Sequence, residues 1–167
     1  RRRVLLVASC PTPQPEYGPM AKPVFVLNGP NLNLLGVREP QIYGRDTLAD
    51  VKARAEQRAK SLGLQIDFRL SNTVGEIIGC VQEAQSAASA IIINAAGLTH
   101  TSVALLDVLQ ASELPVVEVH LSNIFRRESF RQHSYVSLAA TGVICGLGAQ
   151  GYELALEAVR SILNKTA

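Results

Sequence analysis

The chain has 167 residues, of which 47% are hydrophobic and 18% are charged, as is typical of one globular domain and not of a disordered chain. Its formal net charge of +2 comes entirely from residues 1–19, where three arginines stand against one glutamate, so the chain from Met20 onward is neutral. A neutral domain without a basic stripe argues against a nucleic-acid partner, and no apolar run is long enough to span a membrane.

Residues 1–19 differ in composition from the rest of the chain. A basic start is followed by an apolar segment, 4–9, that is shorter than the ~7–15 apolar residues of a signal peptide. A proline-rich stretch then leads to Met20, the only methionine, directly before the first apolar run. We therefore expect residues 1–19 to be a disordered or non-native extension, Met20 to be the natural start, and residues 20–167 to form a single domain.

Three cysteines, Cys10, Cys80 and Cys145, are too few and too scattered for a disulfide framework or a zinc site. Cys145 lies in the apolar run 142–145, so we expect its thiol to be buried in the core. This cysteine usage fits a reducing compartment and predicts a cytoplasmic protein.

Strand-like and helix-like patterns alternate along the chain. Short apolar runs predict five strands, at residues 24–27, 64–70, 90–93, 116–119 and 142–145. A helical apolar period predicts four helices, at residues 48–62, 74–86, 102–111 and 149–163. Thr47 and Asp50 form a capping-box pattern before the first helix, and Gly63 ends it. The alternation predicts an α/β fold of the flavodoxin-like type, with a five-stranded parallel sheet of order 2-1-3-4-5 and helices on both faces.

Polar segments follow three of the predicted strands, at residues 28–33, 94–100 and 120–123. Ligands of open parallel sheets bind in the crevice beyond the carboxyl ends of the strands. The three segments therefore meet in one crevice, which predicts an enzyme or a small-molecule binder.

The segment 28–43 is longer than the ~2–6 residues that usually join a strand to a helix, which suggests a lid or a binding loop. It carries Arg38 and Tyr43. A free phenol titrates near pH ~10, so a tyrosine serves as a base at neutral pH only where a nearby cation stabilises its anion. The pair Arg38 and Tyr43 is therefore a candidate for catalytic machinery.

Two histidines follow strands. Glu118 and His120 are two residues apart on a strand and share a face, an arrangement in which a carboxylate orients an acid/base imidazole. The alternative is a histidine that merely packs at the strand end. His100 precedes Thr101 and Ser102 near a helix start, where it either contacts a ligand or takes part in capping.

Arg127 and Arg131 are four residues apart, so one helical turn would direct both toward an anionic or polyhydroxylated ligand. Their neighbour Arg126 keeps the alternative open that this run of charges is a solvated surface.

Other chemistries find little support. Residues 146–151 read G-x-G-x-x-G between a strand and a helix, but neither a further strand nor a ribose-binding acid follows, so we interpret them as close packing of the last helix on the sheet. No lysine lies in a crevice segment, which argues against a Schiff base. No metal-ligand spacing is present, so we expect an acid/base site without cofactor or metal.

Four segments, in order, resemble those of the type II 3-dehydroquinate dehydratases: NGPNLNLLGVREPQIYG, NAAGLTHTSVALLD, EVHLSN with RRESFRQHSY, and TGVICGLGAQGY. The resemblance runs from about Val24 to near the carboxyl terminus. It implies a flavodoxin-like fold and the dehydration of 3-dehydroquinate to 3-dehydroshikimate in the shikimate pathway, without metal or Schiff base. It also implies a homo-oligomer, a dodecamer of four trimers.

The resemblance assigns five catalytic residues. Tyr43 corresponds to the general base that removes a proton next to the ketone, and Arg38 to the arginine that favours the tyrosinate. Asn31 corresponds to the residue that positions a water at the enolate. His120 resembles the acid that protonates the departing hydroxyl, with Glu118 orienting it.

The resemblance also implies seven substrate-contacting residues: Asn94, His100, Asp107, Leu121, Ser122, Arg127 and Arg131. Three of them, Asn94, His100 and Arg131, correspond to residues that bind the ring hydroxyls. The backbone amides of Leu121 and Ser122 would receive the substrate carboxylate. Arg127 resembles a second arginine near the tyrosine, and Asp107 an acid that reaches the site of a neighbouring subunit.

The chain departs from the family pattern at Leu106, where an arginine is common, and at Phe125, where a more polar residue is usual. The first departure affects one expected contact between subunits and neither affects the catalytic set. A non-catalytic flavodoxin-like module that binds FMN or a small anion is the alternative from another class, although the hydroxyl-rich phosphate loop expected after the first strand is missing.

Overall fold

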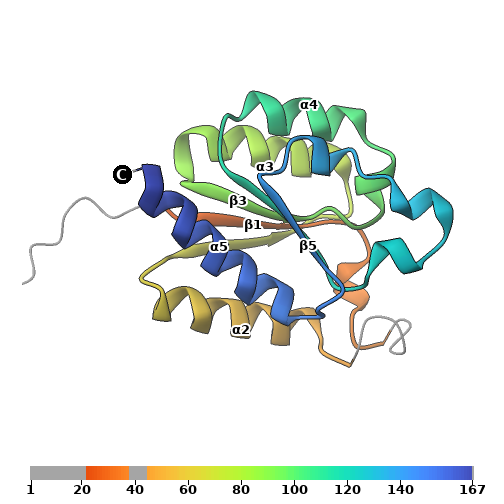
Figure 1. Cartoon of the computed structure of the whole chain (residues 1–167), viewed down its shortest axis with the longest axis horizontal. Helices are drawn as coiled ribbons and strands as arrows, with labels where there is room; N and C mark the ends of the chain where they lie inside the picture. Colours follow the sequence, from red (N-terminus) through yellow and green to blue (C-terminus); the bar gives the residue numbers. More distant parts are fainter. Residues whose placement is uncertain (1–21, 38–44, 167) are drawn as a thin grey trace, which may run out of the picture.

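The computed structural model describes residues 22–37 and 45–166. Five parallel strands form one sheet of order β2-β1-β3-β4-β5, which confirms the predicted topology (Figure 1). The strands are β1 (Val24–Asn28), β2 (Ile66–Leu70), β3 (Ala90–Asn94), β4 (Val116–His120) and β5 (Gly142–Cys145). The α-helices are α2 (Leu48–Ser61), α3 (Val74–Ala87), α4 (Val103–Ala111) and α5 (Gln150–Thr166). The predicted extension 1–19 lies outside the described residues.

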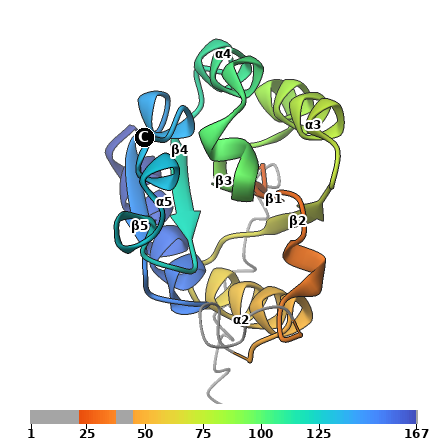
Figure 2. The same cartoon turned by 90° about the vertical axis from the view of Figure 1, so that its right-hand side faces the viewer.

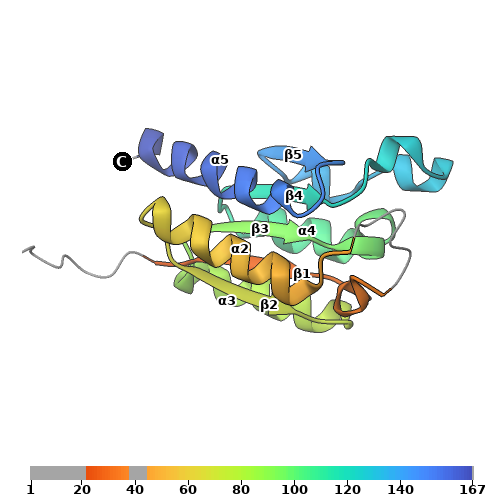
Figure 3. The same ribbon diagram turned by 90° about the horizontal axis from the view of Figure 1, so that it is seen from below.

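Helices cover both faces of the sheet. Helices α2 and α5 lie on one face, and α3 and α4 lie on the other (Figures 2 and 3). Successive side chains of a strand point to opposite faces, so Ile92 packs on the α2/α5 side whereas Ile91 and Ile93 pack on the α3/α4 side. All three isoleucines are fully buried, and burial of such a side chain stabilises the fold by about 1.5–3 kcal/mol.

The ends of α2 follow from its sequence. Thr47 and Asp50 form a capping box, in which each side chain receives the backbone N–H of the other residue. At the other end Gly63 has a φ of +68°, and the N–H of Leu64 donates to the carbonyl of Ala59. Leu64 therefore belongs to the helix end, and the strand predicted to begin there begins at Ile66 instead.

The other boundaries shift by a few residues. Helix α5 runs to Thr166, beyond the predicted end at residue 163, and Ser102 is the N-cap of α4 instead of its first residue. Strand β5 lies at the edge of the sheet, so Cys145 is a free cysteine that is only half-buried, and the prediction of a fully buried thiol was wrong.

Short 3-10 helices follow β1, β3 and β4 along the chain, and the last of them packs against α4. They are η1 (Leu32–Leu34), η2 (Ala96–His100), η3 (Ile124–Arg126), η4 (Ser129–Gln132) and η5 (Val136–Leu138). Three of them lie between β4 and β5, where the chain needs a long excursion before it returns to the sheet. Across the described residues, no helix combines the length and the apolar character needed to cross a bilayer.

Candidate active site

A pocket opens beyond the carboxyl ends of β1, β3 and β4, where the sequence predicted a crevice. Its wall combines apolar side chains from the first loop with polar groups from the β3 and β4 loops. The lining residues are Pro30, Asn31, Leu32, Leu35, Asn94, Ala96, Gly97, His100, His120, Leu121, Ser122, Ile124, Arg127 and Arg131.

Most of the predicted site residues meet in this pocket. Eight of them line it: Asn31, Asn94, His100, His120, Leu121, Ser122, Arg127 and Arg131. Glu118 lies behind His120 and is fully buried. Asp107 does not line the pocket and is exposed on α4. Arg38 and Tyr43 lie outside the described residues.

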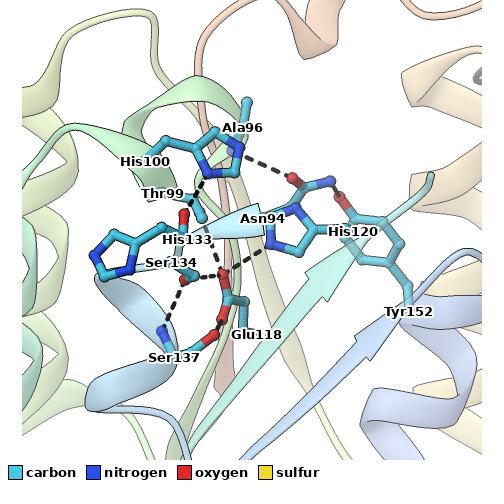
Figure 4. Close-up of polar contacts among 10 residues, drawn as sticks. All are labelled: Asn94, Ala96, Thr99, His100, Glu118, His120, His133, Ser134, Ser137 and Tyr152. Atoms are coloured by element: carbon cyan, nitrogen blue, oxygen red, sulfur yellow. Dashed lines mark hydrogen bonds and ion pairs between the residues drawn. The ribbon is translucent and has the colours of Figure 1, made fainter. Parts of the chain in front are cut away.

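The Glu118 and His120 side chains form the acid/base pair predicted from their spacing. His120 Nε2 lies 2.8 Å from Glu118 Oε1, and both residues are buried (Figure 4). The Nε2–H group donates to the carboxylate, which leaves Nδ1 as the ring nitrogen for a ligand. A buried carboxylate beside an imidazole stabilises the imidazolium, so the pair is suited to hold and deliver a proton. The alternative of a merely packed histidine does not fit this contact.

Hydroxyl groups surround the Glu118 carboxylate. Thr99 Oγ1 donates to Oε1 at 3.3 Å and Ser134 Oγ at 2.8 Å, while Ser137 Oγ donates to Oε2. Burial by itself would raise the pKa of Glu118, but the hydrogen bonds from His120, Ser137 and Ser134 outweigh it and hold this pKa below its ordinary value. Glu118 is therefore an ionised, acceptor-only group at neutral pH.

His100 lies beside His120, with ring centroids 6.5 Å apart and planes inclined by 12°. Its Nδ1 is 2.7 Å from the carbonyl oxygen of His133, and a carbonyl accepts only, so Nδ1 carries the proton. Burial, with smaller contributions from His120 and Arg131, lowers the pKa of His100. The neutral ring then presents Nε2 as an acceptor. The capping alternative is wrong for His100, because Ser102 Oγ receives the Leu105 N–H of α4.

The pocket also contains two arginines. Arg127 and Arg131 are mostly buried, and both contact the exposed carboxylate of Glu128, at 3.5 Å and 2.9 Å from their Nε atoms. Arg131 lies in η4, whereas Arg127 directly precedes Glu128, so the two arginines do not belong to one regular helix. The neighbouring Arg126 is exposed, so the solvated-surface interpretation holds for Arg126 alone. Two guanidinium groups near one exposed glutamate favour an anionic ligand.

The β1 and β4 loops are fixed by backbone contacts. Asn31 has a left-handed backbone with a φ of +67°, and its N–H donates to Asn72 Oδ1 at 2.9 Å. After β4, the carbonyls of His120 and Leu121 accept the N–H groups of Gly146 and Gly148. Both polar loops therefore keep a defined path beside the pocket.

Comparison with known proteins identifies the family. A family model described as Dehydroquinase class II matches residues 22–160. The chain belongs to this family. It is 61% identical over 143 residues to the 3-dehydroquinate dehydratase of Phenylobacterium zucineum, which covers 86% of this chain and 99% of that protein. It is 56% identical over 138 residues to 3-dehydroquinate dehydratase 2 of Pseudomonas aeruginosa, which covers 83% of this chain and 93% of that protein.

A solved structure gives the same result. The type II dehydroquinase from Propionibacterium acnes superposes with a TM-score of 0.81 at 44% identity, and covers 85% of this chain and 98% of that chain. The predicted resemblance is confirmed, and it favours an enzyme over a non-catalytic FMN or anion-binding module. Within residues 22–37 and 45–166, no group of three or more His, Cys, Asp or Glu side chains is arranged to hold a metal ion.

Sequence reasoning missed several residues that support the site. Ser134 lies between η4 and η5 and Ser137 lies within the short η5, where no period indicates which side chains share a face. Thr99 was not a candidate, although its hydroxyl contacts Glu118. Tyr152 was treated as part of a packing helix, yet its hydroxyl contacts Asn28 and Asn94. For these four residues the sequence carried no local signal.

Proposed function

We propose that this chain dehydrates 3-dehydroquinate to 3-dehydroshikimate, as a hydro-lyase of the shikimate pathway. The observation that carries the proposal is the buried Glu118–His120 pair at a pocket with two arginines, in a chain of the class II dehydroquinase family. Two relatives, 61% and 56% identical over the matched residues, are 3-dehydroquinate dehydratases.

The reaction runs through an enolate by acid/base catalysis. Loss of a hydroxyl beta to a ketone requires a base for the proton on the carbon between them, and an acid for the departing hydroxyl. His120 is the acid, since Glu118 stabilises its imidazolium and fixes the ring. Each such proton transfer contributes about 10²–10⁴-fold to the rate.

Tyr43 is the base in this proposal, and the positive charge of Arg38 stabilises the tyrosinate form of Tyr43. Asn31 holds the water that stabilises the charge on the former ketone oxygen. The support for these roles is the family membership and the position of Asn31 at the pocket wall.

The polar pocket wall binds the substrate. Asn94, His100 and Arg131 take the ring hydroxyls, and the acceptor Nε2 of His100 suits a hydroxyl donor. The backbone amides of Leu121 and Ser122 receive the carboxylate. Arg127 adds positive charge on the same wall, which suits an anionic substrate.

The active form is proposed to be a dodecamer of four trimers in the cytoplasm. Asp107 supports this assembly, because an exposed acid that lies outside its own pocket is available to the site of a neighbouring subunit. Light scattering coupled to size-exclusion chromatography measures the mass, and a monomer that is fully active would contradict the assembly.

The function is tested by following the enone absorbance of the product from 3-dehydroquinate. Turnover is expected in the purified protein. Activity is also expected to survive prior treatment with substrate and borohydride, assayed with fresh substrate after the borohydride is removed, because no imine forms. Tyr43→Phe is expected to abolish turnover while substrate binding, measured by calorimetry, persists. Turnover of Tyr43→Phe at the wild-type rate would refute the role of Tyr43, and inactivity of the wild type would refute the function.

A further inference from the structure

The hydroxyl of Tyr152 joins two strand ends under the pocket. Tyr152 lies in the first turn of α5 and is only 1% exposed. Its O–H donates to Asn28 Oδ1 at 2.7 Å. The hydroxyl oxygen accepts from Asn94 Nδ2 at 3.0 Å (Figure 4). Burial raises the pKa of Tyr152, so the hydroxyl stays protonated and acts as a donor. Among these three residues only Asn94 lines the pocket.

The two asparagines are brought together by the sheet register. Asn28 ends β1, Asn94 ends β3, and they are direct partners across the two strands. Both lie on the face that α5 covers, since their strands place Val26 and Ile92 on that face two residues earlier. A hydroxyl from α5 therefore meets both carboxamides at the edge of the pocket.

Backbone groups at the two ends of this chain of hydrogen bonds fix its direction. The N–H of Ala96 is a donor only, so the group of Asn94 that faces it at 3.3 Å is Oδ1. The carbonyl of Arg69 is an acceptor only, so Asn28 directs Nδ2 toward it at 2.8 Å. With both ends fixed, Asn94 directs Nδ2 toward Tyr152, and Tyr152 must donate to Asn28. A flipped Asn94 carboxamide would place its oxygen against the hydroxyl oxygen and its amino group against the Ala96 N–H.

The glycine-rich turn before α5 permits this reach. Gly146 has a φ of +85°, and a Cβ there would lie 3.0 Å from Asn123 Cβ. A Cβ on Gly151, the residue before Tyr152, would lie 3.3 Å from Val119 Cγ1 of β4. The G-x-G-x-x-G pattern thus sets α5 close against the sheet, where the Tyr152 ring passes beneath the strand ends.

We propose that Tyr152 is a positioning residue for the reaction, because its hydroxyl holds the Asn94 carboxamide in one orientation toward the substrate. One N–H and one oxygen lone pair of Asn94 are used by Tyr152 and Ala96, and the other N–H and lone pair remain for a substrate hydroxyl. This inference rests on the proposed function, in which Asn94 binds a ring hydroxyl.

Loss of the Tyr152 hydroxyl removes the group that rejects the flipped carboxamide. Asn94 then keeps only the longer contact to Ala96, and the binding-competent orientation is populated less. A binding residue that acts equally on substrate and transition state changes KM and leaves kcat in place. A structural defect would instead lower the amount of folded enzyme and therefore kcat.

The decisive experiment is a double-mutant cycle with Tyr152→Phe and Asn94→Ala, read as KM and kcat for 3-dehydroquinate. Tyr152→Phe is expected to raise KM about tenfold with kcat within about threefold, since one hydrogen bond of ~1.4 kcal/mol corresponds to a factor of ten. In the Asn94→Ala background the same change is expected to leave KM unaltered, because Tyr152 acts through Asn94.

Two further variants complete the test. Tyr135→Phe removes a hydroxyl from a tyrosine outside this network and is expected to leave KM unchanged. Asn28→Ala removes the acceptor of the Tyr152 proton without touching the pocket, and is expected to raise KM in the same direction by a smaller factor. If Tyr152→Phe proves too unstable to assay, Asn28→Ala carries the test alone.

An unchanged KM in Tyr152→Phe, or an equal rise in KM in both backgrounds, would overturn the inference. The orientation is also measured without substrate, from exchange of the Asn94 side-chain amide protons by NMR. Slow exchange in the wild type and fast exchange in Tyr152→Phe are expected, and equal rates would overturn the inference. A wild type that does not turn over 3-dehydroquinate would contradict the proposed function but not this contact.

Discussion

Two polar networks lie at the same edge of the sheet but on opposite faces, and they work by different physics. On the α5 face, Asn28, Asn94 and Tyr152 form a neutral network whose direction is fixed by two backbone groups. On the α4 face, Glu118 and His120 form a charged network held by hydroxyl side chains. We propose that the first network controls orientation and that the second controls a proton.

The difference teaches how a parallel sheet divides tasks within one pocket. The two-residue period of a strand sends the last side chains of β1 and β3 to one face and that of β4 to the other. Polar groups for binding and for proton transfer are thereby separated by the backbone of the sheet. Each network can then be disturbed separately, and four changes test this separation.

The largest effect is expected from Glu118→Gln, which removes the charge that stabilises the His120 imidazolium. We expect kcat to fall by about 100-fold or more, with KM within a few-fold, because the loss falls on general acid catalysis. Steady-state kinetics measures both constants. Glu157→Gln, on an exposed glutamate paired with Arg58, is the matched control. A kcat of Glu118→Gln near that of the control would refute the charged role.

Gly29→Ala is expected to disturb the neutral network of Asn28, Asn94 and Tyr152 without replacing any of these three residues. A Cβ at Gly29 would lie 2.4 Å from the carbonyl oxygen of Ala95, which is backbone and cannot turn away. We expect a loss of about 2–3 kcal/mol in the free energy of unfolding, because such overpacking displaces the β1 end from β3. Urea denaturation measures the loss.

The control for this change is Gly97→Ala, since a Cβ at Gly97 meets nothing within 4 Å. Its free energy of unfolding is expected to stay within about 0.5 kcal/mol of the wild type. Equal losses in the two variants would contradict the close approach of β1 and β3.

Comparing Ser137→Ala with Ser112→Ala tests whether a hydrogen bond to a charged group contributes more to stability than a hydrogen bond to a neutral group. Ser137 donates to the Glu118 carboxylate, whereas the buried Ser112 donates to the carbonyl of Leu109 at 2.7 Å. Hydrogen bonds to charged groups contribute about 1.5–3 kcal/mol and neutral ones about 0.5–1.5 kcal/mol. Ser137→Ala is therefore expected to destabilise more than Ser112→Ala in urea denaturation. The reverse order would argue against a carboxylate at Glu118.

The smallest expected effect is a difference in pH dependence between the networks. The pKa of Glu118 is lowered in the folded protein, so its stabilisation is fully present above the ordinary value of 4.5 and is lost as the pH falls through the lowered pKa. The stability difference between wild type and Glu118→Gln should therefore shrink over that range. The difference between wild type and Tyr152→Phe should stay constant. Urea denaturation at several pH values measures both stability differences. If the two differences change with pH in the same way, the two networks do not differ in charge as described.

Regular patterns made the fold and part of the site predictable from the sequence. The alternation of apolar runs and helical periods predicted the sheet order, and the two-residue spacing of Glu118 and His120 predicted their contact. These features depend on local periodicity, which can be recognised in the amino-acid sequence without knowledge of long-range contacts.

Contacts that depend on long-range packing could not be predicted in the same way. Ser134 and Ser137 reach Glu118 through irregular 3-10 structure, where no period assigns a face. Tyr152 reaches Asn94 because glycines set the distance of α5 from the sheet, a quantity that sequence spacing does not carry. Cys145 was wrongly predicted to be buried because the prediction rested on the apolar run alone, although the predicted strand order already placed this strand at the sheet edge.

The contact of Tyr152 with Asn28 spans 124 residues of chain. During synthesis, Asn28 and Asn94 emerge from the ribosome long before the helix that satisfies them. Without α5, Asn28 would keep its contact with the Arg69 carbonyl and Asn94 its contact with the Ala96 N–H. The Tyr152 hydroxyl adds the contact that joins the two carboxamides, so the binding surface is complete only once the carboxyl-terminal helix has packed on the sheet.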